Sequence, residues 1–144
     1  MRREQIKVEV IQQIRYADSQ ELEEYRHQTP AILLELQSYS KITYQDANQQ
    51  TVEVKWSVDS EDTVQVEITQ PDYRLTFHPT KETATFYQTP QGLWELQVLT
   101  KQIQWHFAPD ESGKAKQQGL TIDYQLKKSE EILGNYRFRL IYSV

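Results

Sequence analysis

Residues 52–68 read VEVKWSVDSEDTVQVEI, and this stretch decides the fold. Apolar and polar side chains alternate over residues 52–58 and again over residues 64–68, with the polar residues 59–62 between the two runs. Successive side chains of a β-strand point to opposite faces, so this alternation is typical of strands with one buried and one solvated face. A short polar connection between two such runs predicts a β-hairpin.

The same alternation recurs along the chain and predicts about ten strands in total. The other clear runs are residues 6–14, 73–77, 94–98, 103–107, 120–126 and 136–142. Ile11 interrupts the first of these runs and predicts a β-bulge. Residues 19–27 fit either a helical turn or a strand, and the strands on both sides of them favour a strand.

Short connections between consecutive strands predict one all-β domain over residues 1–144. All five prolines fall between apolar runs, where a residue that cannot donate to a sheet ladder marks a turn. A single antiparallel, mostly up-and-down meander of about ten one-sided strands tends to twist and close, which removes its exposed edges. The alternative is a two-sheet sandwich, whose Greek-key crossings need longer connections. We therefore expect a closed β-barrel.

The composition excludes several classes of protein. Cysteine is absent, which excludes disulfide scaffolds, thiolate catalysis, zinc–thiolate sites and iron–sulfur clusters. The hydrophobic fraction is 38% and the net charge is −5, and no apolar run approaches the about 20 residues of a membrane-spanning helix. No apolar segment follows the basic residues Arg2 and Arg3, as it would in a secretory signal. We expect a cytoplasmic protein with no membrane insertion.

No motif in the sequence carries recognisable chemistry. The four glycines form no phosphate-binding loop, and no serine lies in a G-x-S-x-G motif. His27, His78 and His106 lack the spacing of metal ligands and are expected to be exposed, as are the acidic residues. We expect no catalytic residue, metal or cofactor, and an enzyme only if His78 or His106 meets a carboxylate in space.

The apolar face of the strands is rich in large rings, and these are the candidate site. We expect five of them to face the barrel interior: Trp56, Tyr73, Trp94, Trp105 and Tyr124. One interpretation is that the rings simply fill the core. The other is that they form the wall of a pocket for a small, partly apolar or fatty-acid-like ligand, in a protein that is not an enzyme.

The charges on the opposite face suggest an alternative function. From Lys114 onward the chain has six basic and three acidic residues. Lys127, Lys128, Arg137 and Arg139 could contact a protein partner, or they could form cross-strand pairs with acidic residues of the same sheet. The aromatic and arginine residues of 136–139 alternate, which places them on opposite faces and argues against a stacking platform for nucleic acid.

Three stretches taken in order resemble a known family. They are Leu75-x-Phe77; Tyr87-x-Thr89-x-x-Gly92, continuing through Glu95-Leu96 to Thr100-Lys101-x-Ile103; and Leu120-x-Ile122-x-Tyr124-x-Leu126. The chain resembles the YwiB-like family of bacterial domains of unknown function over residues 6–142. This resemblance implies a calycin-like β-barrel, related in shape to lipocalins and fatty-acid-binding proteins. It implies no activity or catalytic residue, because the family has none settled.

The lipocalin signature itself is displaced. Lipocalins carry a G-x-W near their N-terminus, whereas Gly92-Leu93-Trp94 comes after most of the predicted strands. We interpret these residues as a hairpin glycine followed by a ring of the core. The resemblance therefore supports the barrel shape and does not extend to lipocalin-type ligand recognition.

Overall fold

The computed structural model describes residues 2–58, 63–109 and 116–143, and these form ten β-strands. Their bounds are β1 Arg2–Tyr16, β2 Leu22–Glu35, β3 Ser40–Gln45, β4 Thr51–Val58, β5 Val64–Gln70, β6 Tyr73–Phe77, β7 Thr83–Thr89, β8 Gly92–Pro109, β9 Lys116–Lys128 and β10 Glu131–Ser143. The described residues include no helix that could cross a membrane. The polar residues 59–62 of the opening hairpin lie outside the described part of the chain.

All strand pairs are antiparallel and belong to one sheet, in the order β6-β5-β4-β3-β2-β1-β10-β9-β8-β7. Every ladder joins strands that are consecutive in sequence, except that the last strand, β10, pairs with the first, β1. The predicted all-β meander is confirmed, and residues 22–27 belong to strand β2, as expected.

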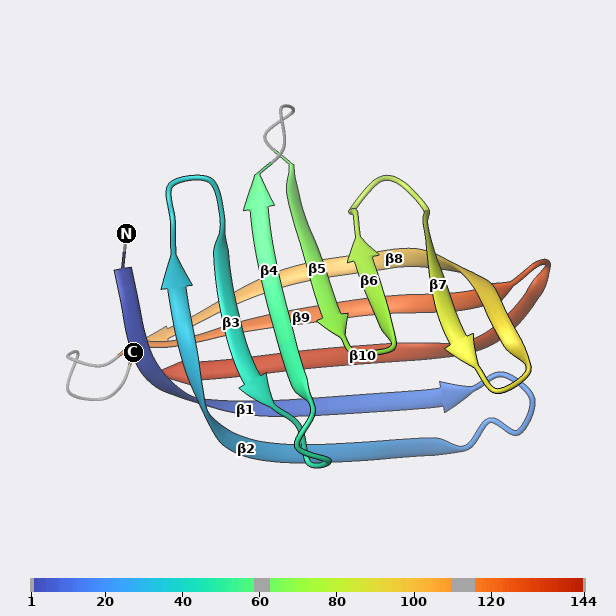
Figure 1. Ribbon diagram of the computed structural model, residues 1–144, viewed down its shortest axis with the longest axis horizontal. Helices are drawn as coiled ribbons and strands as arrows, with labels where there is room; N and C mark the ends of the chain where they lie inside the picture. Colours follow the sequence, from blue (N-terminus) through green and yellow to red (C-terminus); the bar gives the residue numbers. More distant parts are fainter. Residues whose placement is uncertain (1, 59–62, 110–115, 144) are drawn as a thin grey trace.

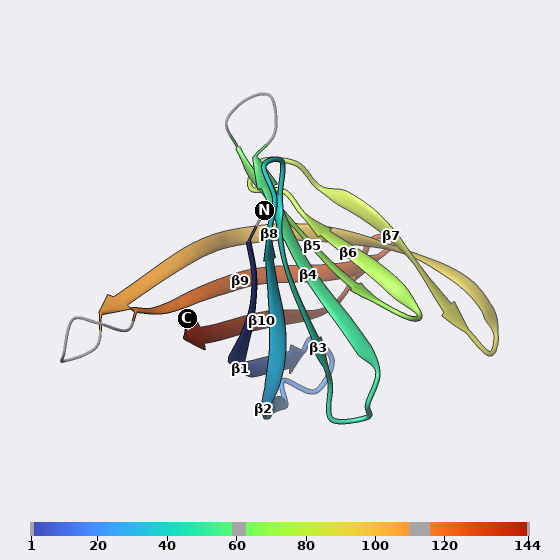
Figure 2. The same ribbon diagram turned by 60° about the vertical axis from the view of Figure 1, so that its left-hand side comes forward.

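The sheet curls into a nearly closed barrel. In Figure 1, the short strands β3–β6 cross in front of the long strands β8–β10. The bent strands β1 and β2 belong to both sets: the start of β1 and the end of β2 lie beside the short strands, and the rest of each runs along the long ones. Figure 2 shows the same crossing from the side. The end strands β6 and β7 lie side by side, but side chains join them in place of a ladder: the hydroxyls of Thr83 and Thr85 donate to the carbonyls of Thr76 and Arg74.

The bulges lie at positions other than the predicted one. β1 keeps an unbroken register through Ile11, whose cross-strand partners are Arg26 and Arg139. Ile11 is nevertheless buried on the outer face, because the aliphatic stems of arginines on both sides can cover an apolar side chain. The predicted bulge at Ile11 is therefore wrong. Register shifts occur instead between Thr100 and Gln102 in β8 and between Ile132 and Gly134 in β10.

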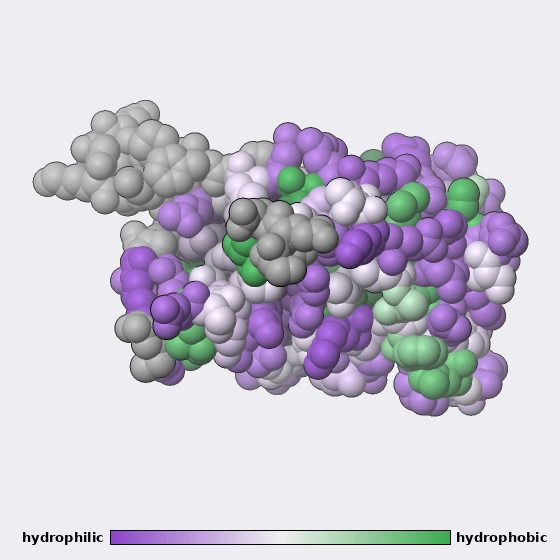
Figure 3. Space-filling view, turned by 90° about the horizontal axis from the view of Figure 1, so that it is seen from above, coloured by the Kyte–Doolittle hydropathy of each residue, from purple (hydrophilic) through white to green (hydrophobic). Residues whose placement is uncertain are grey.

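Much of the barrel interior is an apolar core. Almost every strand contributes alternate residues to it, including Val8, Leu33, Val54, Phe77 and Leu140, all of which are at most 2% exposed. Outside, hydrophilic side chains cover most of the face shown in Figure 3, and apolar side chains form separate small areas. The low hydrophobic fraction is sufficient for a core because the apolar side chains are concentrated on one side of the sheet.

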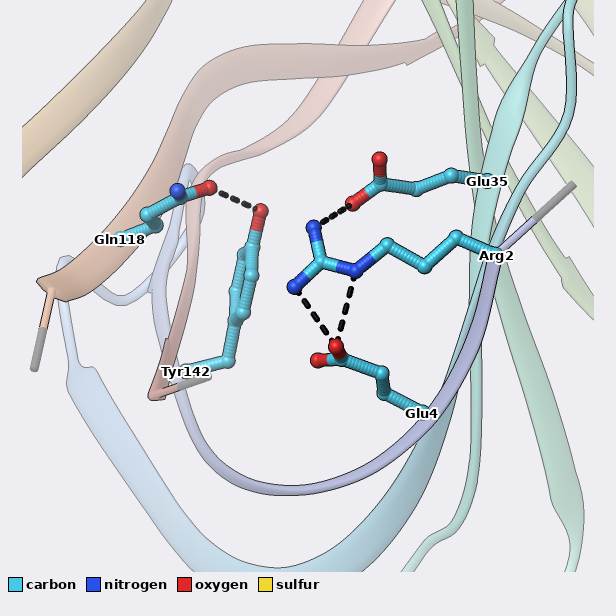
Figure 4. Close-up of polar contacts among 5 residues, drawn as sticks. All are labelled: Arg2, Glu4, Glu35, Gln118 and Tyr142. Carbon is cyan, nitrogen blue, oxygen red and sulfur yellow. Dashed lines mark hydrogen bonds and ion pairs between the residues drawn. The ribbon is translucent and has the colours of Figure 1, made fainter.

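Polar side chains gather at the end of the barrel where β1 begins and β10 ends (Figure 4). The Arg2 guanidinium contacts the carboxylates of Glu4 at 2.8 Å and Glu35 at 3.1 Å. Beside it, the Tyr142 hydroxyl donates to the Gln118 side-chain oxygen over 2.6 Å. Glu4 and Glu35 have the same parity along their strands as the buried Ile6 and Leu33, so these two acids lie on the inner face of the sheet, although their side chains stay 35% and 41% exposed.

Candidate functional site

A cavity of about 340 Å³ lies at the opposite end of the barrel, where β1 ends and β10 begins. Residues from β1, β6, β7, β8, β9 and β10 line it. Six of these are aromatic rings that alternate with aliphatic side chains: Tyr73, Tyr87, Trp94, Tyr124, Tyr136 and Phe138. Its wall is therefore mostly apolar, and its polar groups are four phenol hydroxyls and the side chains of Gln12, Gln13, Thr85 and Arg137.

The rings occupy inward positions of strands that meet at the cavity. Tyr124 and Tyr136 are register partners on β9 and β10, and their rings stack with centroids 5.2 Å apart and planes 12° apart. Tyr73 and Tyr87 face each other at 5.4 Å across the junction of β6 and β7. Phe77, which is fully buried in the core, contacts Tyr124, with ring centroids 4.7 Å apart.

Burial raises the pKa of three phenols of the cavity. Loss of solvation raises the pKa of Tyr73 to about 12, and the neighbouring hydroxyl of Tyr87 adds to this effect. Desolvation also raises the pKa of Tyr124, with smaller contributions from Tyr73 and Tyr136. The pKa of Tyr136 is raised for the same main reason. At neutral pH these side chains are uncharged and can donate a hydrogen bond.

The rim of the cavity carries charge. Trp94 is 36% exposed, and the Lys128 ammonium lies 3.8 Å from the centroid of its ring. At the end of the β1–β2 hairpin, the hydroxyls of Tyr16 and Tyr25 donate to the same carboxylate oxygen of Glu23, at 3.1 and 2.6 Å. Glu23 is the register partner of the lining residue Ile14, so this acid too lies on the inner face, contrary to expectation.

The structure divides the five predicted site residues into two groups. Tyr73, Trp94 and Tyr124 line the cavity. Trp56 and Trp105 do not: their rings contact each other, with centroids 5.4 Å apart, and Trp105 is 43% exposed.

Three lining rings were not among the predicted site residues: Phe138, Tyr136 and Tyr87. Tyr136 heads an alternating run whose inward residues are also aromatic or apolar, and Tyr87 shares its strand face with the buried Thr85. That parity is the signal that could have found these residues.

The histidines differ from the expected exposed imidazoles. His78 is buried at 5% exposure, and its Nδ1 accepts a hydrogen bond from the Thr80 backbone N–H over 3.2 Å. His27 contacts the Gln45 carbonyl through Nε2 at 3.0 Å and so ties β2 to the end of β3. The His106 side chain lies outside the described residues. The described part of the chain contains no cluster of three or more His, Asp or Glu residues suited to a metal.

The basic residues proposed for a protein partner mostly contact groups of the same chain. Arg137 donates two hydrogen bonds to the Asp123 carboxylate, at 2.7 and 3.2 Å, and Lys127 contacts Glu82 at 3.5 Å. Of these contacts, Arg137 with Asp123 is a cross-strand pair of register partners, whereas Lys127 reaches an acid outside the strands and Lys128 lies over the ring of Trp94. A protein partner for Arg137, Arg139, Lys127 and Lys128 stays a prediction.

The comparisons with known proteins concern the fold and the family. No curated protein matches the chain. Among solved structures, the chain is similar to the crystal structure of ywiB protein from Bacillus subtilis, with 17% identity and a TM-score of 0.67, over 97% of this chain and 91% of that one. A similarity at this identity shows the barrel fold alone. The family model described as Domain of unknown function (DUF1934) matches residues 6–140, so the predicted resemblance is confirmed and the chain belongs to this family.

Proposed function

We propose that the protein binds a small, largely apolar molecule in the tyrosine-lined cavity and performs no chemistry on it. The observation that carries the proposal is the interior space of about 340 Å³ behind Trp94, walled by rings on several strands. Small-molecule sites have volumes of about 300–1,000 Å³ and mostly apolar walls with a few polar groups, so this cavity suits a small ligand. Rings that served only as core filler would be expected to close such a space.

Ligand binding can be tested with a neutral fluorescent dye, N-phenyl-1-naphthylamine, whose emission rises in apolar surroundings. We expect saturable binding by the native protein. Leu126 lines the cavity, so the substitution Leu126→Trp fills part of the space and should weaken binding at least about tenfold. Circular dichroism and thermal unfolding would establish that the variant is folded.

The matched control is Leu93→Trp. Leu93 is 61% exposed and does not line the cavity, so the same change of residue type should leave the dye affinity unchanged. Equal dye affinity in the native protein and in folded Leu126→Trp would contradict the proposal, as would a complete lack of saturable binding to the native protein.

A further inference from the structure

The tyrosines of the cavity differ in their hydrogen bonds from Tyr16, Tyr25 and Tyr142, although not from Tyr44, which is buried in the core. The hydroxyls of Tyr16 and Tyr25 donate to Glu23, and that of Tyr142 donates to Gln118. Within the described residues, by contrast, the hydroxyls of the lining residues Tyr73, Tyr87, Tyr124 and Tyr136 have no hydrogen-bond partner in the protein. None of these four hydroxyl oxygens is among the fully buried, unpaired polar atoms of the described residues, so each is accessible from the cavity, where a ligand could accept its hydrogen bond.

The rings that carry these hydroxyls lie close together in pairs. The ring centroids of Tyr73 and Tyr87 are 5.4 Å apart, and those of Tyr124 and Tyr136 are 5.2 Å apart. The four phenols come from β6, β7, β9 and β10, so they surround the cavity from several sides. The site therefore combines flat ring walls with a group of neutral O–H donors, an arrangement suited to a flat molecule with hydrogen-bond acceptors.

The charges around the cavity argue against an ionised ligand. Arg137 is the one cation among the described lining residues, and both its bonds go to Asp123. Lys128 lies at the rim, over the ring of Trp94. No carboxylate belongs to the described lining residues. A carboxylate or ammonium group in the interior would lose its solvation without gaining a free counter-ion, whereas a carbonyl oxygen needs only a neutral donor.

We propose that the ligand is a neutral, flat aromatic molecule with a carbonyl-type oxygen, held by the hydroxyls of Tyr73 and Tyr124, and is not a fatty acid. This inference rests on the proposed function, since it names the chemical class that the same cavity takes. The oxygen accepts hydrogen bonds from the phenols while the rings contact the aromatic body, and no covalent step is involved.

Three molecules with one ring system and nearly equal size separate the possibilities: 2-acetylnaphthalene, 2-ethylnaphthalene and 2-naphthoate. Isothermal titration calorimetry should show that the neutral ketone binds at least about tenfold more tightly than the hydrocarbon or the carboxylate, as expected for one to two neutral hydrogen bonds in a cavity without a free cation. Decanoate, a fatty acid, should bind more weakly than the ketone.

Variants test whether the hydroxyls of Tyr73 and Tyr124 cause the tighter binding of the ketone. In Tyr73→Phe/Tyr124→Phe the rings remain and the O–H donors are lost, so the ketone's advantage over the hydrocarbon should fall about tenfold or more while hydrocarbon affinity is unchanged. Tyr142→Phe removes a hydroxyl at the other end of the barrel, where it bonds Gln118, and should leave all affinities unchanged. The single variant Tyr124→Phe provides the same readout if the double variant does not fold.

The outcomes also separate this inference from the proposed function. If the naphthylamine dye binds and is weakened by Leu126→Trp, but the ketone has no advantage over 2-ethylnaphthalene, the cavity binds ligands and the proposed chemical class is wrong. If 2-naphthoate or decanoate binds more tightly than the ketone, the proposed chemical class of the ligand is also wrong. If the dye does not bind at all, the proposed function itself fails.

Discussion

The hydroxyl of Thr85 in β7 donates a hydrogen bond to the backbone carbonyl of Arg74 in β6. These strands are the two ends of the sheet, and no backbone ladder joins them. Thr83 forms the equivalent bond to the Thr76 carbonyl, and the rings of Tyr73 and Tyr87 meet nearby. The barrel is thus closed at this junction by side chains, next to the candidate cavity.

The substitution Thr85→Val should destabilise the barrel by about 1–3 kcal/mol. Valine keeps the shape of threonine but leaves the Arg74 carbonyl without this donor, and Thr85 is 5% exposed, so water replaces the bond poorly. Denaturant unfolding measures the loss, and hydrogen exchange should become faster in β6 and β7 than in β1 and β10. An unfolding free energy equal to that of the native protein would show that the bond does not hold the junction.

Thr100→Val should have the opposite effect. Thr100 is 6% exposed, and among the described residues its hydroxyl oxygen has no hydrogen-bond partner. Replacing a buried, unpaired hydroxyl by a methyl group of similar size removes a desolvation cost, so we expect a gain of about 1 kcal/mol. The unfolding free energies of Thr85→Val and Thr100→Val can be compared directly in the same denaturant, because both variants lose a buried threonine hydroxyl. A loss of stability in Thr100→Val comparable to that in Thr85→Val would contradict the assignment.

The protein should lose stability at alkaline pH because of its buried phenols. The pKa of Tyr73 rises to about 12 in the folded protein, and that of Tyr124 rises as well, from 10.0 in both cases. Between about pH 10 and 12 the folded state therefore binds more protons than the unfolded state, and the free energy of unfolding falls as the pH rises. Below about pH 10 these groups are protonated in both states and their contribution is constant.

Two such tyrosines should add a slope of up to about 3 kcal/mol per pH unit in this range. The slope is measured by denaturant unfolding at several values between about pH 9 and about pH 11. In Tyr73→Phe/Tyr124→Phe the loss should be clearly smaller, although lysines and other tyrosines still titrate. Equal slopes in the native protein and this variant would show that these phenols do not control the alkaline transition.

Alternation along the strands was sufficient to predict the barrel because one period determines both the type of element and the face that is buried. Residues 94–98 and 103–107 show the limit of this reasoning. They belong to the single strand β8, and the bulge after Thr100 changes the parity of its inward residues. The sequence shows the change from even to odd inward positions, but the same change also fits two strands with a turn.

Alternation also could not distinguish the rings that line the cavity from those that do not. It assigns Trp56 and Trp105 to the same face as Tyr124, because parity gives the side of the sheet. Position along the barrel depends on the stagger of all ten strands, which has no local signal in the sequence. For the same reason the missing ladder between β6 and β7 was not foreseen.

The last prediction separates the two groups of tryptophans. Trp94 lines the cavity at its rim, so Trp94→Leu should weaken 2-acetylnaphthalene about tenfold by removing a ring that contacts the ligand. Trp105 contacts Trp56 and does not line the cavity, so Trp105→Leu should cost about 1 kcal/mol of stability and leave the affinity unchanged. Calorimetry and thermal unfolding on both variants measure the two quantities independently. If Trp105→Leu weakens the ketone as much as Trp94→Leu does, the ligand occupies a different part of the interior from the one proposed.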